Sequence, residues 1–324
     1  MTNKEIYKKT LTFSIRRLLF DVLSIVLFAG VCAAGFFIAD KATGKGYIGL
    51  IIGAVIGLIA VIIISRFISY ALKAGQIAMM TRAITDGELP ENVYAEGKRA
   101  VKERFATVAV FFAATRVIKG IFGQVGRGLT AAGNAIGGDT GGAVGSAISS
   151  AIQTIVAYLC DCCLGWVFYR KAQSAARATC EGAVLFFRHG KTFAKNAGRI
   201  FGMGLVSLLA IGGALTGVFY LVLSNFKGTF EVIASKIAEA SAAGEGEQIP
   251  AFLSNPATLL IVCAALLALV LWAVIHSAFI RPFVLTGVLK NYITSGMNDV
   301  PDESSFSVLE SKSKKFAKLR SELN

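Results

Sequence analysis

Continuous apolar stretches of about 20 residues constrain this chain more than any other feature, because that length of helix crosses a hydrocarbon core of roughly 30 Å. The chain is 55% hydrophobic and 16% charged, too apolar for a soluble fold, in which roughly a quarter of residues are charged. Its 34 glycines and 5 prolines suit packed membrane helices better than a β-barrel. We therefore expect one integral membrane domain over residues 1–324, an all-α polytopic bundle. The clear stretches are Leu18–Ala39, Tyr47–Ile64, Ile148–Tyr169, Phe201–Leu223 and Thr258–Ile280.

The positions of the basic residues predict the orientation, because Lys and Arg in short loops stay in the cytoplasm. Most of the 33 lie in four segments, which should share that side. Five crossings would place one of these segments outside, so a sixth is expected at Phe105–Gly123. Both termini are then cytoplasmic, as is a charged tail at 301–324. The basic segments are Met1–Arg17, Ser65–Arg104, Arg170–Arg199 and Arg281–Asn324.

The expected sixth span contains two basic residues, Arg116 and Lys119, three positions apart and so on one helical face. Intramembrane cations are costly, and they are normally paired, turned inward or extended to an interface. Three interpretations stay open. The two side chains reach the outer boundary, they line a polar pathway, or the segment is re-entrant.

Short loops and glycine spacings predict how the helices pack. The loop Asp40–Gly46 should make the first two spans a tight hairpin. Gly53 and Gly57, and likewise Gly213 and Gly217, have the small-xxx-small spacing that lets helix backbones approach closely. Glycine-rich helices of this kind could also support a homo-oligomer.

The start of the chain and its cysteines both favour a membrane-embedded chain without disulfides. The first apolar stretch has full membrane length and no small-residue cleavage site before Asp40, so we expect a retained helix and no cleavable signal. The six cysteines lie almost entirely inside apolar segments or at their inner ends, which favours free thiols. These features fit a cell membrane, plasma or bacterial inner.

Asp161 is the main candidate for a binding residue, because a carboxylate well inside an apolar span is a functional hypothesis by default. An acidic residue among aromatic rings suits a cationic or quaternary ammonium ligand. The alternative is that Asp161 pairs with an internal base such as Arg116. The expected substrate-binding residues are Asp161, Gln153, Tyr158, Trp166 and Tyr169; Asp21 and His276 are weaker candidates because both lie near an interface.

Other chemistry is not expected. The chain has no hydrolase constellation, phosphate loop or nucleotide fingerprint, and only two histidines, so we expect no enzyme and no cofactor. The run from Cys160 to Cys163 is a poor metal chelate, because adjacent helical residues point in different directions. The net charge of +13 needs no partner beyond the lipid bilayer, and no nucleic acid is expected.

Three short motifs, in this order, resemble the choline transporter-like family over roughly residues 139–295. They are Thr140-Gly141 with Gly145 and Gln153, His189-Gly190-Lys191-x-Phe193 with the following Ala194–Ala197, and Ile275–Phe279 leading to Tyr292. The resemblance implies a transporter of choline or a related small amine. The family usually has more spans and a large loop after the first, and an acidic cluster where this chain has Lys290-Asn291-Tyr292.

Three functions follow from these patterns. The first is a permease for choline or a related small amine, with Asp161 at its site. The second is a scaffold or assembly protein that does not transport, with a dry interior and every buried charge paired. The third is transport of an anionic solute or lipid along a path lined by Arg116, Lys119 and Arg281. A continuous polar cavity would favour the first or third, and the sign of its charge would separate them.

Overall fold

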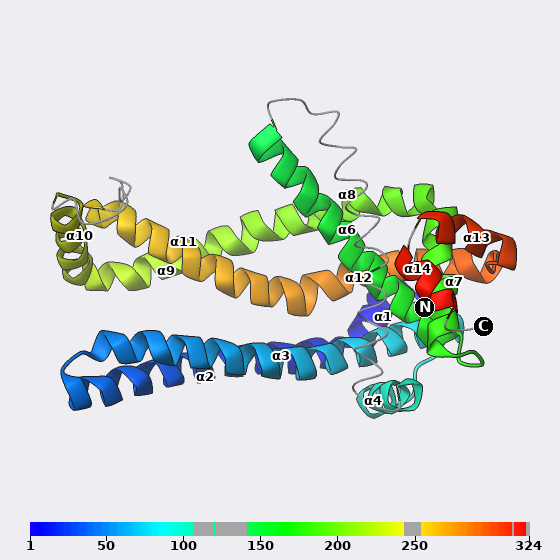
Figure 1. The fold of residues 1–324 in the computed structure, drawn as a ribbon, viewed down its shortest axis with the longest axis horizontal. Helices are drawn as coiled ribbons and strands as arrows, with labels where there is room; N and C mark the ends of the chain where they lie inside the picture. The colour runs from blue at the N-terminus through cyan, green and yellow to red at the C-terminus, as the bar shows by residue number, and fades with distance from the viewer. Residues whose placement is uncertain (106–119, 121–140, 243–253, 313, 322–324) are drawn as a thin grey trace. The chain divides into compact units, whose positions relative to one another are not determined.

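The computed structural model describes residues 1–105, 120, 141–242, 254–312 and 314–321, and every regular element within them is a helix (Figure 1). The helices form two compact units, residues 1–201 with 281–324, and residues 202–280. The elements are α1 (Asn3–Lys9), α2 (Leu11–Thr43), α3 (Gly46–Thr85), α4 (Val93–Arg104), α6 (Gly141–Tyr169), α7 (Ala175–Arg188), α8 (Gly190–Ser207), the π-helical turn η2 (Leu208–Gly212), α9 (Gly213–Leu223), the 3-10 turn η3 (Ser224–Phe226), α10 (Lys227–Ala242), α11 (Pro256–Ile275), the π-helical turn η5 (His276–Ile280), α12 (Arg281–Asn298), α13 (Glu303–Lys312) and α14 (Lys314–Ser321).

Four helical stretches are long and apolar enough to cross a membrane, which is consistent with an integral membrane protein. They contain four of the five expected apolar stretches. The fifth coincides with α6, which contributes a shorter apolar helix over Gln153–Tyr169. The expected span Phe105–Gly123 lies outside the described residues except at its first residue and Gly120. The four stretches are Leu11–Thr43, Gly46–Thr85, Gly198–Glu239 and Pro256–Asn298.

The first two spans form the predicted hairpin. Gly44 ends α2 in the left-handed conformation (φ 68°), where glycine carries no Cβ penalty, and its N–H bonds to the Asp40 carbonyl. A Cβ added at Gly35 would lie 2.3 Å from the Gly49 carbonyl oxygen, and one at Gly53 would lie 2.7 Å from the Val31 carbonyl oxygen. The glycines therefore let the two backbones touch, as the spacing of Gly53 predicted.

Beyond its apolar stretch, α3 continues to Thr85 and becomes part of the core of the first unit. Ile77 and Met80 are fully buried there, and a turn leads into α4, whose first turn is capped by the Asn92 side chain. By contrast, only 6% of the apolar window of α2 and 18% of that of α3 is buried within the chain, as expected of surfaces that contact lipid.

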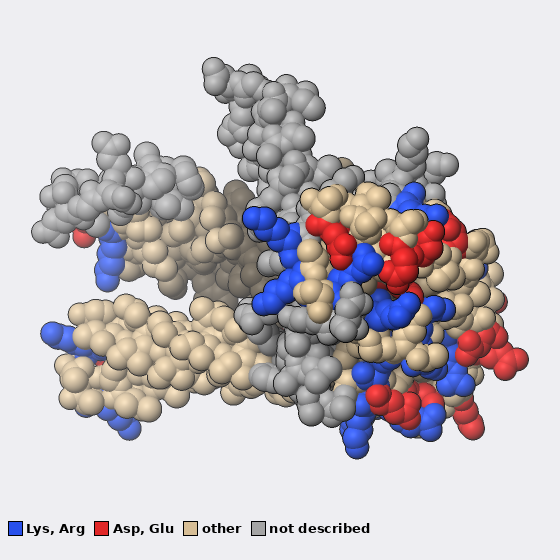
Figure 2. Space-filling view, turned by 45° about the vertical axis from the view of Figure 1, so that its right-hand side comes forward, with Lys and Arg blue, Asp and Glu red and all other residues tan. Residues whose placement is uncertain are grey.

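The core of the first unit forms where the basic end of the α2–α3 hairpin meets α6, α7 and α12; by basic end we mean the end that carries Arg17 and Lys73. Trp166 and Tyr292 are its largest buried side chains. The Tyr292 hydroxyl donates to the Gly182 carbonyl of α7. In Figure 2, charged side chains gather over this end and uncharged atoms cover most of the hairpin.

The tail after Pro301, which the sequence predicted to be charged, folds back as two short helices. Phe306 of α13 stacks on Phe316 of α14 at 6.2 Å between ring centroids. Both rings belong to one buried apolar cluster with Cys160, Cys163 and Cys180. Burial raises the pKa of the Cys180 thiol to about 12, so this thiol is protonated at neutral pH. All six cysteines are free, as predicted.

The second unit is built on α9 and α11. The Trp272 indole donates to the Ser207 hydroxyl at 3.3 Å, and α10 packs against α11. Gly213 and Gly217 have no described atom within 4 Å of an added Cβ. The packing role predicted for this glycine pair is therefore not observed in the described residues, unlike that of Gly53.

Candidate functional site

A group of charged side chains meets where α2, α3, α6 and α12 converge in the first unit. Asp161 of α6 lies at its centre, with its side chain only 7% exposed. One carboxylate oxygen is 2.5 Å from the Lys73 ammonium, and the other accepts a bond from the Arg281 guanidinium at 2.9 Å. Asp161 is therefore paired with two cations, which hold α6 to α3 and to α12.

A second pair extends this group onto α2. Arg17 and Asp21 are four residues apart on one helical face, with 3.9 Å between the Arg17 Nε and a carboxylate oxygen. The Ser69 hydroxyl of α3 donates to Asp21 at 3.4 Å. Arg17, Lys73 and Arg281 are close enough for their charges to repel one another. We call the seven residues the Asp161 cluster; they are Arg17, Asp21, Ser69, Lys73, Tyr158, Asp161 and Arg281.

The Asp161 cluster has unequal charge and unsatisfied donors. Three cations face two carboxylates, which leaves one positive charge in excess. The Nε atoms of Arg17 and Arg281 are both buried and have no hydrogen-bond acceptor among the described residues, and the 3.9 Å separation at Arg17 is too long for a hydrogen bond. A buried N–H without an acceptor costs free energy, so both arginines could accommodate an additional acceptor oxygen.

The aromatic residues predicted to surround Asp161 separate into two groups. Tyr158 is buried in the Asp161 cluster, with its ring centre 5.3 Å from the Arg281 guanidinium carbon. Trp166 donates instead to Glu181 of α7 at 3.1 Å and packs against Tyr169 with ring centroids 5.0 Å apart.

Glu181 connects the second group, because it binds both Trp166 and Arg170. Its side chain is 4% exposed and lies 3.0 Å from Arg170, which follows α6. The indole, the carboxylate and the guanidinium therefore fasten α7 to the end of α6. Gln153, about two turns before Asp161, has an exposed side chain.

The sequence did not identify three members of the Asp161 cluster, which are Arg17, Ser69 and Lys73. Arg17 and Lys73 were counted only as basic residues that set the orientation in the membrane. Arg17 lies four residues from Asp21, and Lys73 lies four residues from Ser69, spacings that place each pair on one helical face. Arg281 was predicted as part of a basic pathway, and it lies in the cluster. The other two residues of that pathway, Arg116 and Lys119, lie outside the described residues.

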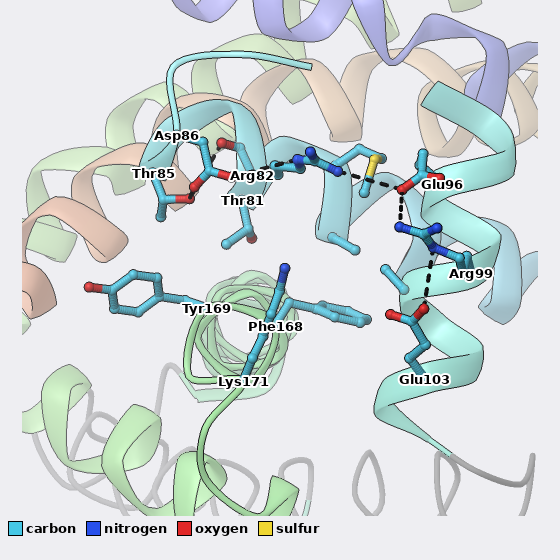
Figure 3. Close-up of a pocket in the computed structure, with 13 residues that line it drawn as sticks. Thr81, Arg82, Thr85, Asp86, Glu96, Arg99, Glu103, Phe168, Tyr169 and Lys171 are labelled. Carbon is cyan, nitrogen blue, oxygen red and sulfur yellow. Dashed lines mark hydrogen bonds and ion pairs between the residues drawn. The ribbon is translucent and has the colours of Figure 1, made fainter. Parts of the chain in front are cut away.

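A separate pocket of about 230 Å³ opens between α3, α4 and the end of α6 (Figure 3). Its acidic and basic side chains largely pair with one another, as Arg99 does with Glu96 at 2.8 Å and with Glu103 at 3.2 Å. Lys171 points towards α3 without an ion pair in the described part of the chain. Three bases and three acids line the pocket, so its charge favours neither a cation nor an anion.

Within the described residues, no group of three or more His, Cys, Asp and Glu side chains could hold a metal ion. The adjacent Cys162 and Cys163 are buried. Cys163 directs its thiol to the Thr179 carbonyl at 3.6 Å, so this thiol serves the packing of α6 against α7.

Known proteins do not add to these observations. The chain matches no family model, no curated protein and no solved structure. The resemblance to the choline transporter-like family stays a prediction from short motifs, and function is inferred here from the Asp161 cluster.

Proposed function

We propose that this integral membrane protein binds an anionic ligand, one that carries phosphate or carboxylate oxygens, at the Asp161 cluster. The excess of three cations over two carboxylates, with two buried guanidinium Nε–H groups lacking acceptors, carries the proposal. The proposal agrees with the third function expected from the sequence, transport of an anionic solute or lipid. Arg281 is the residue of that expected pathway that lies among the described residues.

The chemistry of the donors favours an oxyanion. Guanidinium groups present a planar fork of N–H donors that matches phosphate and carboxylate, and they are more weakly hydrated than ammonium groups. Hydrogen bonds between charged partners are roughly twice as strong as neutral ones. An oxyanion between Arg17 and Arg281 would satisfy both Nε–H groups and offset the repulsion between the cations.

The amine permease is the alternative, supported by the resemblance and by Tyr158 beside Asp161. An amine would have to displace Lys73 or Arg281 from the carboxylate while exposed to the remaining cations, which repel it. A scaffold without a ligand predicts that every buried charge is paired, and the ion pairs of the cluster fit that expectation. It does not account for the excess cation or for the two Nε–H groups without acceptors.

The membrane arrangement that accompanies this proposal has six spans, with both termini in the cytoplasm of a cell membrane. Four apolar stretches of spanning length support it, as does the distribution of basic segments along the sequence. In this orientation the basic end of the α2–α3 hairpin faces the cytoplasm.

The test is thermal unfolding of the full chain in detergent with sodium phosphate, sodium chloride of equal ionic strength or choline chloride. A ligand that binds only the folded state stabilises it, so phosphate far above its dissociation constant should raise the unfolding midpoint by about 3 °C or more. Arg17→Gln and Arg281→Gln should each abolish this shift.

Arg16→Gln is the matched control. It removes the same charge one position away, from a guanidinium that stacks 3.9 Å above the Tyr94 ring and outside the Asp161 cluster, and should keep the phosphate shift. Stabilisation by choline, increased in Arg281→Gln because a repelling cation is gone, would contradict the anion proposal and support the amine permease.

A further inference from the structure

We infer that the anionic ligand is the phosphate-bearing headgroup of an anionic membrane lipid, held at the basic end of the α2–α3 hairpin with its acyl chains along the exposed faces of these helices. This inference rests on the proposed function and narrows the ligand to one class. Its evidence is the depth of the cluster in the membrane, the apolar surface beside it and its net charge.

The length of α3 gives the depth of one cation. A hydrocarbon core of about 30 Å takes about 20 residues of helix, so a core that starts at Gly46 ends near Ser65. Lys73 is eight residues further, about 12 Å at 1.5 Å per residue. Helical side chains lean towards the N-terminus, here back towards the membrane, which brings the ammonium to the headgroup layer.

The two arginines have similar depths. A core that starts at Thr43 and follows α2 backwards ends near Ser24, and Arg17 lies about 10 Å beyond it. Arg281 and Lys73 bind the two oxygens of the same Asp161 carboxylate, so Arg281 lies at the depth of Lys73. The cations of the cluster are therefore expected beside the layer of lipid phosphates.

The cluster adjoins apolar surface that an acyl chain can cover. Immediately after Arg17, the α2 side chains Leu19 and Leu23 are 62% and 61% exposed. On α3, Ile62 and Ile63 precede Ser69 by about two turns and are about half exposed. A free phosphate would leave these faces unused, whereas a phospholipid contacts both the cations and the apolar side chains.

The net charge selects among lipids. A headgroup with one net negative charge balances the single excess cation of the cluster, whereas a zwitterionic headgroup adds an ammonium that the three cations repel. Part of each side chain stays exposed for this contact, because the Arg17, Lys73 and Arg281 side chains are 16%, 17% and 26% exposed.

The test is native mass spectrometry of the full chain in detergent, titrated with phosphatidylglycerol or phosphatidylcholine. Phosphatidylglycerol should bind about fivefold to tenfold more tightly, the size expected of one net charge near the headgroup. Arg17→Gln with Arg281→Gln should remove this preference, and Arg16→Gln should retain it. Arg17→Lys, which keeps the charge, should keep most of the preference and shows whether a loss reflects misfolding.

A parallel titration with inorganic phosphate separates the two proposals. If phosphate binds through Arg17 and Arg281 but the two lipids bind equally well, the lipid inference is overturned and the anion site stands. If the folded protein binds neither phosphate nor phosphatidylglycerol, both proposals are overturned.

Discussion

Asp161 shows how one buried carboxylate can organise several helices. It accepts from Lys73 and Arg281, residues that lie far from it in the chain, so the ion pairs form only when α3, α6 and α12 pack together. Buried ion pairs contribute little net stability against apolar replacements, but removal of one partner leaves uncompensated charge and is strongly destabilising.

Asp161→Asn should therefore lower the free energy of unfolding by about 2–3 kcal/mol, somewhat less than for a fully buried pair because both cations keep partial exposure. Thermal unfolding in detergent measures the loss. Asp86→Asn is the control, since Asp86 is 55% exposed and lies 3.6 Å from Arg82, and its pair should contribute little. Equal midpoints for Asp161→Asn and the wild type would show that the pairs do not hold the helices.

The sequence identified Asp161 because a carboxylate in an apolar span is costly and therefore conspicuous. It suggested an internal base such as Arg116 as a partner. Arg116 lies outside the described residues, and the partners within them are Lys73 and Arg281. Lys73 lies nine residues past an apolar stretch, where a basic residue is expected for topology alone. Tertiary packing also makes Lys73 an ion-pair partner of Asp161, which no local sequence pattern indicates.

Among the elements, the α2–α3 hairpin was the most predictable. A loop of a few residues between two apolar stretches leaves no arrangement other than antiparallel neighbours, and glycine spacing indicates close approach. The same spacing in α9 makes no close contact with another described residue, because small residues permit a contact without requiring one. Helix-helix contact depends on the partner surface as much as on the glycine.

Gly35→Ala tests the close approach in the hairpin. Its methyl group would lie 2.3 Å from the Gly49 carbonyl oxygen, so the helices must separate, and we expect a loss of about 1–3 kcal/mol in the free energy of unfolding. Gly30→Ala on the same helix is the matched control, because an added Cβ there meets no described atom within 4 Å. It should leave stability unchanged or raise it by at most about 1 kcal/mol. Equal effects of the two substitutions in detergent unfolding would exclude tight glycine packing.

For the whole molecule, the sequence predicted the helical class from apolar length and low charge, and the described residues bear this out. The number of crossings depends on residues 105–123, where two cations interrupt the apolar stretch. Hydropathy alone does not show whether such a segment crosses the membrane, because neighbouring helices can stabilise its charges.

The six-span arrangement predicts that both termini lie on the same side. Single-cysteine tags at the N-terminus and the C-terminus, placed in a chain whose six native cysteines are replaced by serine or alanine, should be inaccessible to a membrane-impermeant maleimide in intact cells. Both should become accessible after permeabilisation. Labelling of one terminus alone in intact cells would show an odd number of crossings and require reassignment of the topology.

The most direct measurement of the central claim, anion binding by the Asp161 cluster, is NMR of the arginine Nε–H groups in the full chain labelled with ¹⁵N-arginine in detergent. Arg17 and Arg281 resonances, assigned by their loss in the two glutamine variants, should shift on addition of phosphate as their buried Nε–H groups gain an acceptor, while the Arg16 resonance stays in place. If the Arg17 and Arg281 resonances do not move at saturating phosphate, the cluster is a structural ion-pair network and the anion proposal is wrong.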